Sequence, residues 1–136
     1  MRNDDAEDGS VTATAFSIAL LSVLLNAAAQ LFLKAGTNVV GTVSFGDANT
    51  FNTLLSIARV PWFWAGFACY GISLFTWIAT LSRLPVSVAY PLVSIGYVVN
   101  ALAAWWLFGE SLTVQKLIGV GFIIIGVILV STTVSK

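Results

Sequence analysis

Long apolar runs separated by short polar connections predict four membrane-spanning helices. The runs cover about residues 12–33, 62–81, 86–108 and 117–134. At about 1.5 Å of rise per residue, such runs match the roughly 30 Å hydrocarbon core of a bilayer. We therefore expect an all-α integral membrane protein in which residues 12–136 form a single four-helix transmembrane domain.

Amide and hydroxyl side chains form a stripe along the first span. Ser22, Asn26 and Gln30 stand four residues apart on one helical face, and Lys34 closes the span. Because an Asn and a Gln inside a membrane are costly without hydrogen-bond partners, this stripe is expected to face the interior of the bundle. Lys34 on its own is typical of an interfacial anchor whose amine reaches water.

The third span carries a second polar stripe. Its hydrogen-bonding residues include Tyr90, Ser94, Tyr97 and Asn100. Pro91 removes a backbone donor near the start of the span, where we expect a kink. The stripe should face protein or water rather than lipid, and the alternative is that each side chain bonds only to its own helix or to a neighbour.

The segments outside the spans have distinct characters. Residues 1–11 are expected to form a flexible acidic tail that has no basic n-region of a signal peptide, so the first span should be retained. About residues 49–59 are predicted to form a short amphipathic helix on the membrane surface, with a lid over a cavity mouth as the alternative. Its apolar face comprises Phe51, Leu54, Leu55 and Ala58, and its candidate caps are Asp47 and Asn49.

Small residues and short connections indicate how the spans pack. Gly66 and Gly71 favour close helix approach in the second span. Only Leu84 and Pro85 separate Arg83, at the end of that span, from the third, so these two spans are expected to be antiparallel neighbours.

The fourth span has a glycine seam and a polar turn before it. Gly119 and Gly126 lie two turns apart with Gly121 alongside, which suits tight pairing within the chain or between two copies. Thr113 is a candidate cap for this span. Glu110 is expected to be structural, as an anchor at a helix end or as a partner of Lys116.

Composition excludes several kinds of chemistry. Of the 136 residues, 58% are hydrophobic and 9% are charged, and the formal net charge is zero, so no nucleic-acid partner is expected. The chain has no His and a single Cys, Cys69, which excludes a Cys/His metal site, a disulfide framework and catalysis by His. Lacking a nucleophile with a base, the chain is not expected to be an enzyme, and no cofactor is expected.

Neither orientation nor assembly follows from the chain alone. Four spans place Arg2, Arg83 and Lys136 on one side and Lys34, Arg59 and Lys116 on the other, so the positive charges do not set the orientation. Four helices form a thin wall, and a substrate pathway would need a second wall. We therefore expect a dimer, with an identical or a related four-helix subunit.

Two stretches carry a family resemblance. The segments NAAAQLFLKAG and LPVSVAYPLVSIGYVVNALAAWWLFGESLTVQKLIGVGFIIIGVILV resemble the drug/metabolite transporter superfamily. Within it, they are most similar to the four-helix subunits that resemble small multidrug resistance proteins, and especially to the small flippase subunits for aminoarabinose-phosphoundecaprenol. The resemblance covers the chain except the tail and the connection over residues 35–60.

The resemblance implies transport, and one departure bears on the cargo. Small multidrug resistance exporters carry a glutamate in the first helix, eight residues before a lysine that resembles Lys34; here Asn26 takes that place and cannot titrate. The first hypothesis is therefore translocation of a polyprenyl-phosphate-linked sugar across the bacterial inner membrane without proton coupling. Alternatives are export of organic cations or guanidinium, transport of another amphiphile, and a non-transporting partner of a glycosyltransferase or larger carrier.

The candidate site residues follow from that hypothesis. The groups expected to bond sugar hydroxyls are Asn26, Gln30, Tyr90, Ser94, Tyr97 and Asn100. Lys34 and Arg83 are expected to meet the phosphate at the membrane boundary. Trp62, Trp105 and Trp106 are expected to belong to the interfacial belt, with stacking on a sugar as the alternative.

Overall fold

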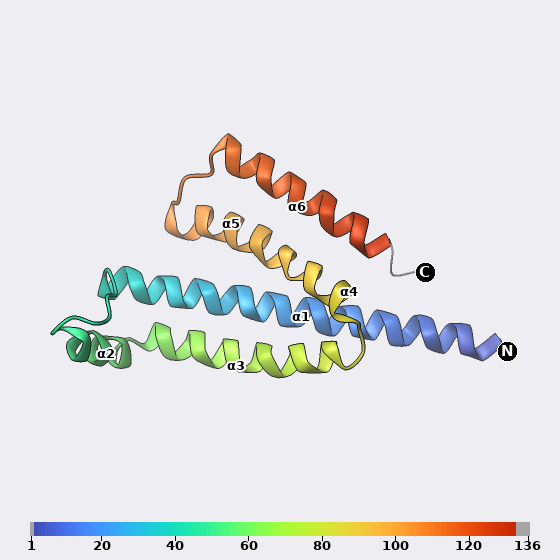
Figure 1. Cartoon of the computed structure of the whole chain (residues 1–136), viewed down its shortest axis with the longest axis horizontal. Coiled ribbons are helices and arrows are strands. Elements are labelled where there is room, and N and C mark those ends of the chain that lie inside the picture. The colour runs from blue at the N-terminus through green and yellow to red at the C-terminus, as the bar shows by residue number, and fades with distance from the viewer. Residues whose placement is uncertain (1, 133–136) are drawn as a thin grey trace.

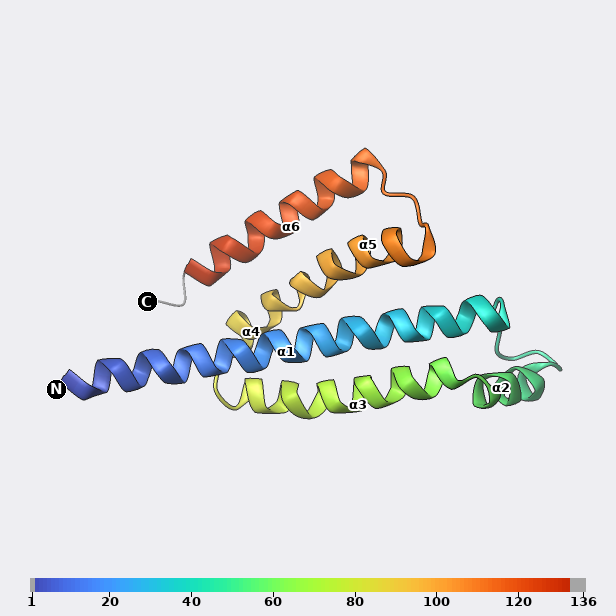
Figure 2. The same ribbon diagram turned by 180° about the vertical axis from the view of Figure 1, so that it is seen from behind.

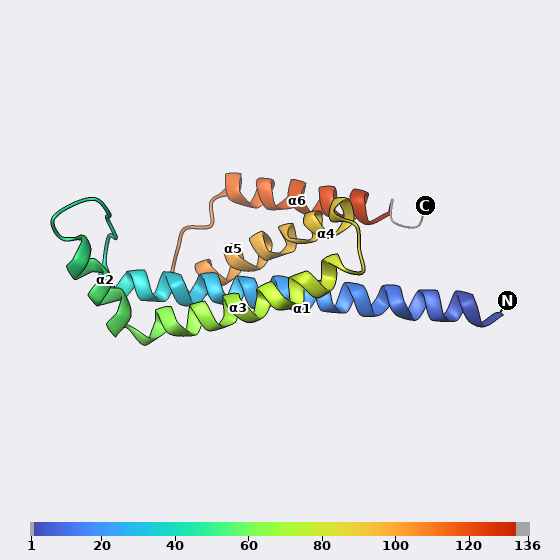
Figure 3. The same cartoon turned by 60° about the horizontal axis from the view of Figure 1, so that its bottom comes forward.

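The protein is built of α-helices. The computed structural model describes residues 2–132, with side chains described for residues 13–130 and Thr132, and this part contains no β-strand. The helices in chain order are α1 (Arg2–Val40), α2 (Thr50–Arg59), α3 (Pro61–Leu81), α4 (Val86–Leu92), α5 (Ser94–Phe108) and α6 (Val114–Thr132). α1 and α3 lie side by side, and α5 and α6 form a second pair above them (Figures 1 and 3).

Three helical stretches of the described chain are long and apolar enough to cross a membrane. They are Ala13–Val40 in α1, Pro61–Leu81 in α3, and Val86–Phe108, which combines α4 and α5; their mean hydropathies are 2.0, 1.3 and 1.6. Val114–Val130 in α6 forms a shorter apolar stretch. The chain is therefore a multi-pass integral membrane protein, and a fourth crossing by α6 stays a prediction.

α1 is longer than the first predicted span in both directions. Its helical backbone begins at Arg2 and ends at Val40, so it runs past both predicted boundaries, near residues 12 and 33. At the far end Gly41 adopts a φ of 89°, which glycine adopts readily, and its N–H bonds to the Thr37 carbonyl at 2.7 Å. The mobility of the acidic segment stays a prediction.

The third predicted span is interrupted at Val93. Pro91 lies inside α4 and has no N–H to donate, so the helix cannot continue with regular bonding. The Val93 N–H bonds to the Tyr90 carbonyl at 3.0 Å, and the Gly96 N–H bonds to the Val93 carbonyl at 2.9 Å, which is three-residue spacing. The expected kink is thus a short break that separates α4 from α5.

Close packing joins α1 to α3. Gly66 is buried against α1, where an added Cβ would lie 2.9 Å from a Leu33 methyl and 3.2 Å from the Ala29 carbonyl oxygen. The Ser22 hydroxyl also donates to the Ser73 carbonyl across the same interface. Gly71, which was expected to play the same part as Gly66, has no neighbouring atom within 4 Å of an added Cβ.

The second predicted span contacts only the first part of the third: α4 contacts α3, whereas α5 does not, so the prediction that these spans are antiparallel neighbours is wrong for α5. No Cα atoms of α3 and α5 approach within 8 Å, whereas α5 contacts α1 and α6. The helix break redirects the chain, and α5 touches α1 at Gly96, where an added Cβ would lie 3.3 Å from Val23 Cγ1. From this contact toward its C-terminal end, α5 slants away from α1 in Figures 1 and 2 and approaches it in Figure 3, so the two helices cross at an angle.

The predicted amphipathic helix is present as α2, although its capping differs from expectation. α2 has no buried residue, and Phe51, Leu54 and Leu55 are exposed. Neither Asp47 nor Asn49 caps it through its side chain. The Thr50 hydroxyl instead accepts from the Gly46 N–H at 3.0 Å and donates to the Asp47 carbonyl at 2.7 Å, while the Asp47 carboxylate accepts from Ser44.

The turn between α5 and α6 is held by backbone contacts. Gly109 ends α5 with a φ of 66°, and the Glu110 N–H bonds back to the Ala104 carbonyl at 3.3 Å. The Thr113 hydroxyl accepts from the Lys116 N–H at 3.3 Å, which confirms the predicted cap. Of the two roles expected for Glu110, pairing with Lys116 is not observed in the described part of the chain, where the Lys116 amine donates to the Ser111 carbonyl at 2.8 Å.

The glycine seam of α6 faces no other described part of the chain. Added Cβ atoms at Gly119, Gly121 and Gly126 would meet nothing within 4 Å. Of the two uses predicted for the seam, pairing within the chain is therefore not observed. Pairing between two copies or with a related subunit stays a prediction.

Candidate functional site

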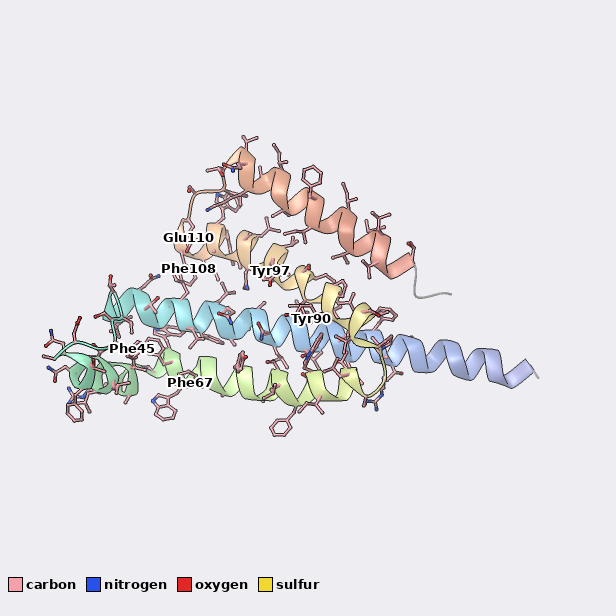
Figure 4. The ribbon with its side chains drawn as sticks, in the orientation of Figure 1. Phe45, Phe67, Tyr90, Tyr97, Phe108 and Glu110 are labelled. Carbon is pink, nitrogen blue, oxygen red and sulfur yellow. The ribbon has the colours of Figure 1, made fainter. Side chains whose placement is uncertain are left out.

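A cavity of about 590 Å³ lies between α1, α3 and the α4–α5 arm. α1 forms its floor, and α3 and α5, which do not contact each other, form its two sides. Tyr90, Tyr97 and Phe108 lie along the α4–α5 arm, beside α1 (Figure 4). The polar lining residues are Ser22, Asn26, Gln30, Lys34, Tyr70, Ser73, Tyr90, Tyr97 and Asn100, and the others are Val23, Leu31, Leu74, Trp77, Val93, Gly96, Ala104 and Phe108.

The cavity begins where the packed core ends. The buried core lies near the α3–α4 turn and consists of Ala15, Ala19, Leu84, Ala89 and Leu92. Trp77 packs against this core and also lines the cavity. Farther along, the cavity lies between the polar stripes of α1 and of the α4–α5 arm. The helix break and the Gly96 contact place α5 beside α1, so that both stripes border this space.

Six of the eight predicted site residues line this one cavity. They are Asn26, Gln30, Lys34, Tyr90, Tyr97 and Asn100. Ser94 is half-buried on α5 and is not among the lining residues. The two polar stripes therefore face a shared space, and their role in binding a substrate stays a prediction.

Arg83 lies at the opposite end of the bundle from Lys34. Its guanidinium donates to the Ala79 carbonyl at 2.9 Å and lies 3.4 Å from the Ser82 hydroxyl. Lys34 lies at the other end of α3, because its neighbour Leu33 packs on Gly66. The helical rise from Gly66 to Arg83 is about 25 Å. One phosphate cannot contact both cations at once, in agreement with their expected places on opposite sides of the membrane, and a phosphate contact of either stays a prediction.

Two hydroxyl groups that line the cavity donate hydrogen bonds to main-chain carbonyls, whereas the side-chain amides there do not. Ser22 donates to the Ser73 carbonyl at 2.8 Å, and Ser73 donates to the Tyr70 carbonyl at 2.7 Å.

In the described part of the chain, the side chains of Asn26 and Gln30 make no hydrogen bond. The phenol groups of Tyr70, Tyr90 and Tyr97 make none there either. The side-chain oxygen of Asn100 is buried and also lacks a partner. A buried acceptor without a bond is costly, so this oxygen calls for a donor from a ligand, water or second chain.

The lining carries one charged group. Lys34 is exposed, and its amine has no ion pair among the residues whose side chains are described. No carboxylate lines the cavity: Asp47 and Glu110, the acids in this same range, lie on the connections before α2 and α6. The described residues also contain no group of His, Cys, Asp and Glu able to hold a metal ion. The site therefore suits binding by hydrogen bonds, aromatic contact and one positive charge.

The contribution of α3 to the cavity was not predicted from the sequence. Tyr70, Ser73, Leu74 and Trp77 all line the cavity from this helix. Their spacing of three, four and seven residues is a helical face, so the signal was present in the sequence. Trp62, Trp105 and Trp106 do not line the cavity; Trp62 stacks on Phe32 with ring centroids 5.9 Å apart.

The chain matches a known family of membrane proteins. Residues 31–123 match the sequence model of the family described as Small Multidrug Resistance protein. No solved structure matches the chain. The match covers the lysine end of α1 and most of α2–α6, and it begins after Asn26 and Gln30.

Curated relatives extend the match to the first span. A protein of Shewanella sediminis named "Probable 4-amino-4-deoxy-L-arabinose-phosphoundecaprenol flippase subunit ArnF" is 37% identical over an alignment of 122 positions that covers 83% of this chain and 84% of the relative. A Yersinia enterocolitica protein of the same name is 39% identical over 116 residues, covering 82% and 88%. A Klebsiella pneumoniae protein named as subunit ArnE of that flippase is 36% identical over 74 residues, covering 53% and 66%.

Proposed function

Because the chain belongs to the small multidrug resistance family, we propose that it is a transporter subunit that translocates a polyprenyl-phosphate-linked saccharide between membrane leaflets. The observation that carries this proposal is the chemistry of the cavity. Asn26, Gln30 and Asn100 present unbonded amides, and Lys34 is the one charged residue. Relatives named as flippase subunits support the same cargo class.

Neutral hydrogen-bonding groups suit a sugar that must be bound and then released. A hydroxyl exchanges water for an amide or phenol at a small net free energy, so no single bond holds the head group tightly. Asn26, Gln30, Tyr97 and Asn100 would bond the sugar, and Tyr90 would do so beside the helix break. Lys34 would pair with the phosphate as a point charge.

Translocation is proposed to proceed without proton exchange. Exchange of a proton for a cationic substrate needs an acid within the membrane, and the cavity has none among its lining residues. Consumption of the lipid on the far side would draw the cargo across. No metal or cofactor is required by this scheme.

The assembly is proposed to be a dimer, with an identical or a related four-helix subunit. The cavity lacks a wall between α3 and α5, and the glycine seam of α6 is unpaired within the described chain. Similarity to proteins named as two different subunits, ArnF and ArnE, supports a related partner. α6 is proposed to be the fourth crossing, and α2 to lie at the interface of the bacterial inner membrane with its apolar face in the bilayer.

Export of organic cations is the second candidate. It is favoured by the family match and by aromatic residues in the lining, namely Tyr70, Trp77, Tyr90 and Tyr97. The absence of a carboxylate from that lining opposes it. A third possibility, a partner that stabilises a glycosyltransferase without transporting, predicts a stable one-to-one assembly with that enzyme and no flipping.

A liposome assay tests the proposal. The purified protein, alone and with a related subunit, is reconstituted with a polyprenyl-phosphate-linked pentose that carries a fluorophore, and dithionite then reduces the probe in the outer leaflet. Transport between leaflets makes nearly all of the probe reducible, whereas protein-free liposomes protect about half, the share of the inner leaflet. Protection equal to that of protein-free liposomes in both preparations would reject the proposal.

A further inference from the structure

The polar stripe of α1 extends beyond the central cavity. Ser22, Asn26, Gln30, Lys34 and Asn38 follow one another at four-residue intervals. In an α-helix each step rises about 6 Å and turns about 40° around the axis. The stripe therefore climbs about 24 Å while it winds around α1. Its start faces the central cavity, and its end faces another side of the helix.

A second hollow, of about 410 Å³, lies at the far end of this stripe. It is lined by Lys34, Thr37, Asn38, Gly41, Thr42 and Val43. Gly41, with its φ of 89°, ends α1 and turns the chain so that Thr42 and Val43 return beside the helix. Lys34 lines both the hollow and the central cavity, so the two spaces meet at its side chain.

The hydrogen-bonding groups of the hollow are mostly uncommitted. The Thr37 hydroxyl donates to the Lys34 carbonyl at 2.8 Å and keeps its capacity to accept. Within the described chain, neither the Asn38 amide nor the Thr42 hydroxyl makes a hydrogen bond, and both residues are exposed. The carbonyl groups of the last turn of α1 add acceptors and a partial negative charge. Such a set favours hydroxyl donors over a free anion, and Lys34 supplies the one positive charge.

We propose that this hollow is a second saccharide-binding site, in which Asn38 and Thr42 hold the sugar of a phosphate-linked saccharide while its phosphate stays on Lys34. The inference rests on the proposed transport function and adds a second binding site outside the central cavity. The head group moves between the two sites by pivoting about its phosphate, because Lys34 borders both. The connection that follows Lys34, through Asn38 and Thr42, thereby takes part in handling the cargo.

Binding measurements with two soluble probes test this site. Geranyl phosphate carries the anion alone, and a geranyl-phosphate-linked pentose adds the sugar. The double substitution Asn38→Ala with Thr42→Val is compared with Asn52→Ala with Thr53→Val on α2, which changes the same residue types outside both spaces. Removing two hydrogen bonds should raise the Kd of the pentose-linked probe about fivefold to fiftyfold and leave that of geranyl phosphate within twofold. The control should change neither value.

The outcomes separate this inference from the transport proposal. An unchanged Kd for the pentose-linked probe, or equal weakening of both probes, would overturn the second site. If Asn26→Leu still weakens the pentose-linked probe in that case, the central cavity keeps its proposed function. If the unaltered protein binds neither probe, the transport proposal fails and the second site with it. Thermal unfolding of each variant, together with Thr42→Val alone, distinguishes lost contacts from lost folding.

Discussion

The hydroxyl of Ser22 on α1 donates a 2.8 Å hydrogen bond to the main-chain carbonyl of Ser73 on α3, and both residues are 3% exposed. The bond crosses the main helix interface directly beside the cavity. The Ser73 carbonyl also accepts from the Thr76 hydroxyl at 2.9 Å, so it would keep a partner if Ser22 were changed. This geometry links the stability of the bundle to one side chain of the polar stripe.

Substitution of Ser22 should therefore weaken the α1–α3 pair by a modest amount. Ser22→Ala is expected to lower the free energy of unfolding by about 1 kcal/mol, the typical net value of one hydrogen bond between helices. Unfolding in mixed micelles at increasing denaturing-detergent fraction measures the change. Ser17→Ala is the control, because the Ser17 hydroxyl bonds to Ala13 within the same helix. Equal effects of the two substitutions would contradict a role for the interhelical bond.

Two glycines of α3 provide a matched pair for the packing argument. Gly66→Ala places a Cβ 3.2 Å from the Ala29 carbonyl oxygen, so α1 and α3 must move apart, and we expect a loss of about 1–3 kcal/mol. Gly71→Ala meets nothing within 4 Å and should be neutral or stabilising by up to about 1 kcal/mol, because alanine favours a helix. Thermal unfolding in detergent distinguishes them. A larger loss at Gly71 than at Gly66 would refute this packing.

The two cations at opposite ends of the bundle should differ in their effect on lipid binding. Lys34→Gln removes the charge in the cavity and is expected to weaken geranyl phosphate about tenfold to hundredfold, the usual range for a charged hydrogen bond. Arg83→Gln should change the Kd by less than twofold, since that guanidinium caps the end of α3. Isothermal titration supplies both values. Comparable losses would mean that the phosphate site is shared or misplaced.

The response to a proton gradient tests the role assigned to Asn26. The unaltered protein should flip the labelled lipid at the same rate with and without a pH difference across the liposome. Asn26→Glu adds an ionisable acid to the lining, so binding of tetraphenylphosphonium should appear and should strengthen as pH rises and the acid loses its proton. Transport by the unaltered protein that depends on the pH gradient, and loses this dependence on Asn26→Leu, would contradict movement without proton coupling.

The local features of the fold were accessible from the sequence because they depend on short spacings. Helical periodicity indicated the stripe that includes Asn26 and the amphipathic face that includes Phe51, and the residue type at Thr113 predicted its cap. The same reasoning found the Tyr90–Asn100 stripe. Each of these is set by neighbours within about two turns of one helix.

The relations between distant parts of the chain were not accessible in the same way. The short turn at Leu84 and Pro85 suggested that the second and third spans run side by side, yet the break at Val93 and the Gly96 contact turn α5 onto α1. Opposite charges on Glu110 and Lys116 suggested an ion pair, but the Lys116 amine donates its hydrogen bond to the Ser111 carbonyl within the turn. The spacing of residues along one helix does not determine which of several nearby helices it packs against, or which of several nearby acceptors a side chain bonds.

The unfilled side between α3 and α5 affects how cargo preference is determined. In the proposed dimer, the second subunit would lie opposite Asn26 and Gln30, so part of what the head group meets would be encoded in a different polypeptide, or in a second copy under symmetry. In a heteromeric pair, the partner subunit could carry a carboxylate that favours amino sugars or cations, while this sequence stays unchanged. Selectivity in such a system is a property of the pair, and exchange of one member is a simple route to a new cargo.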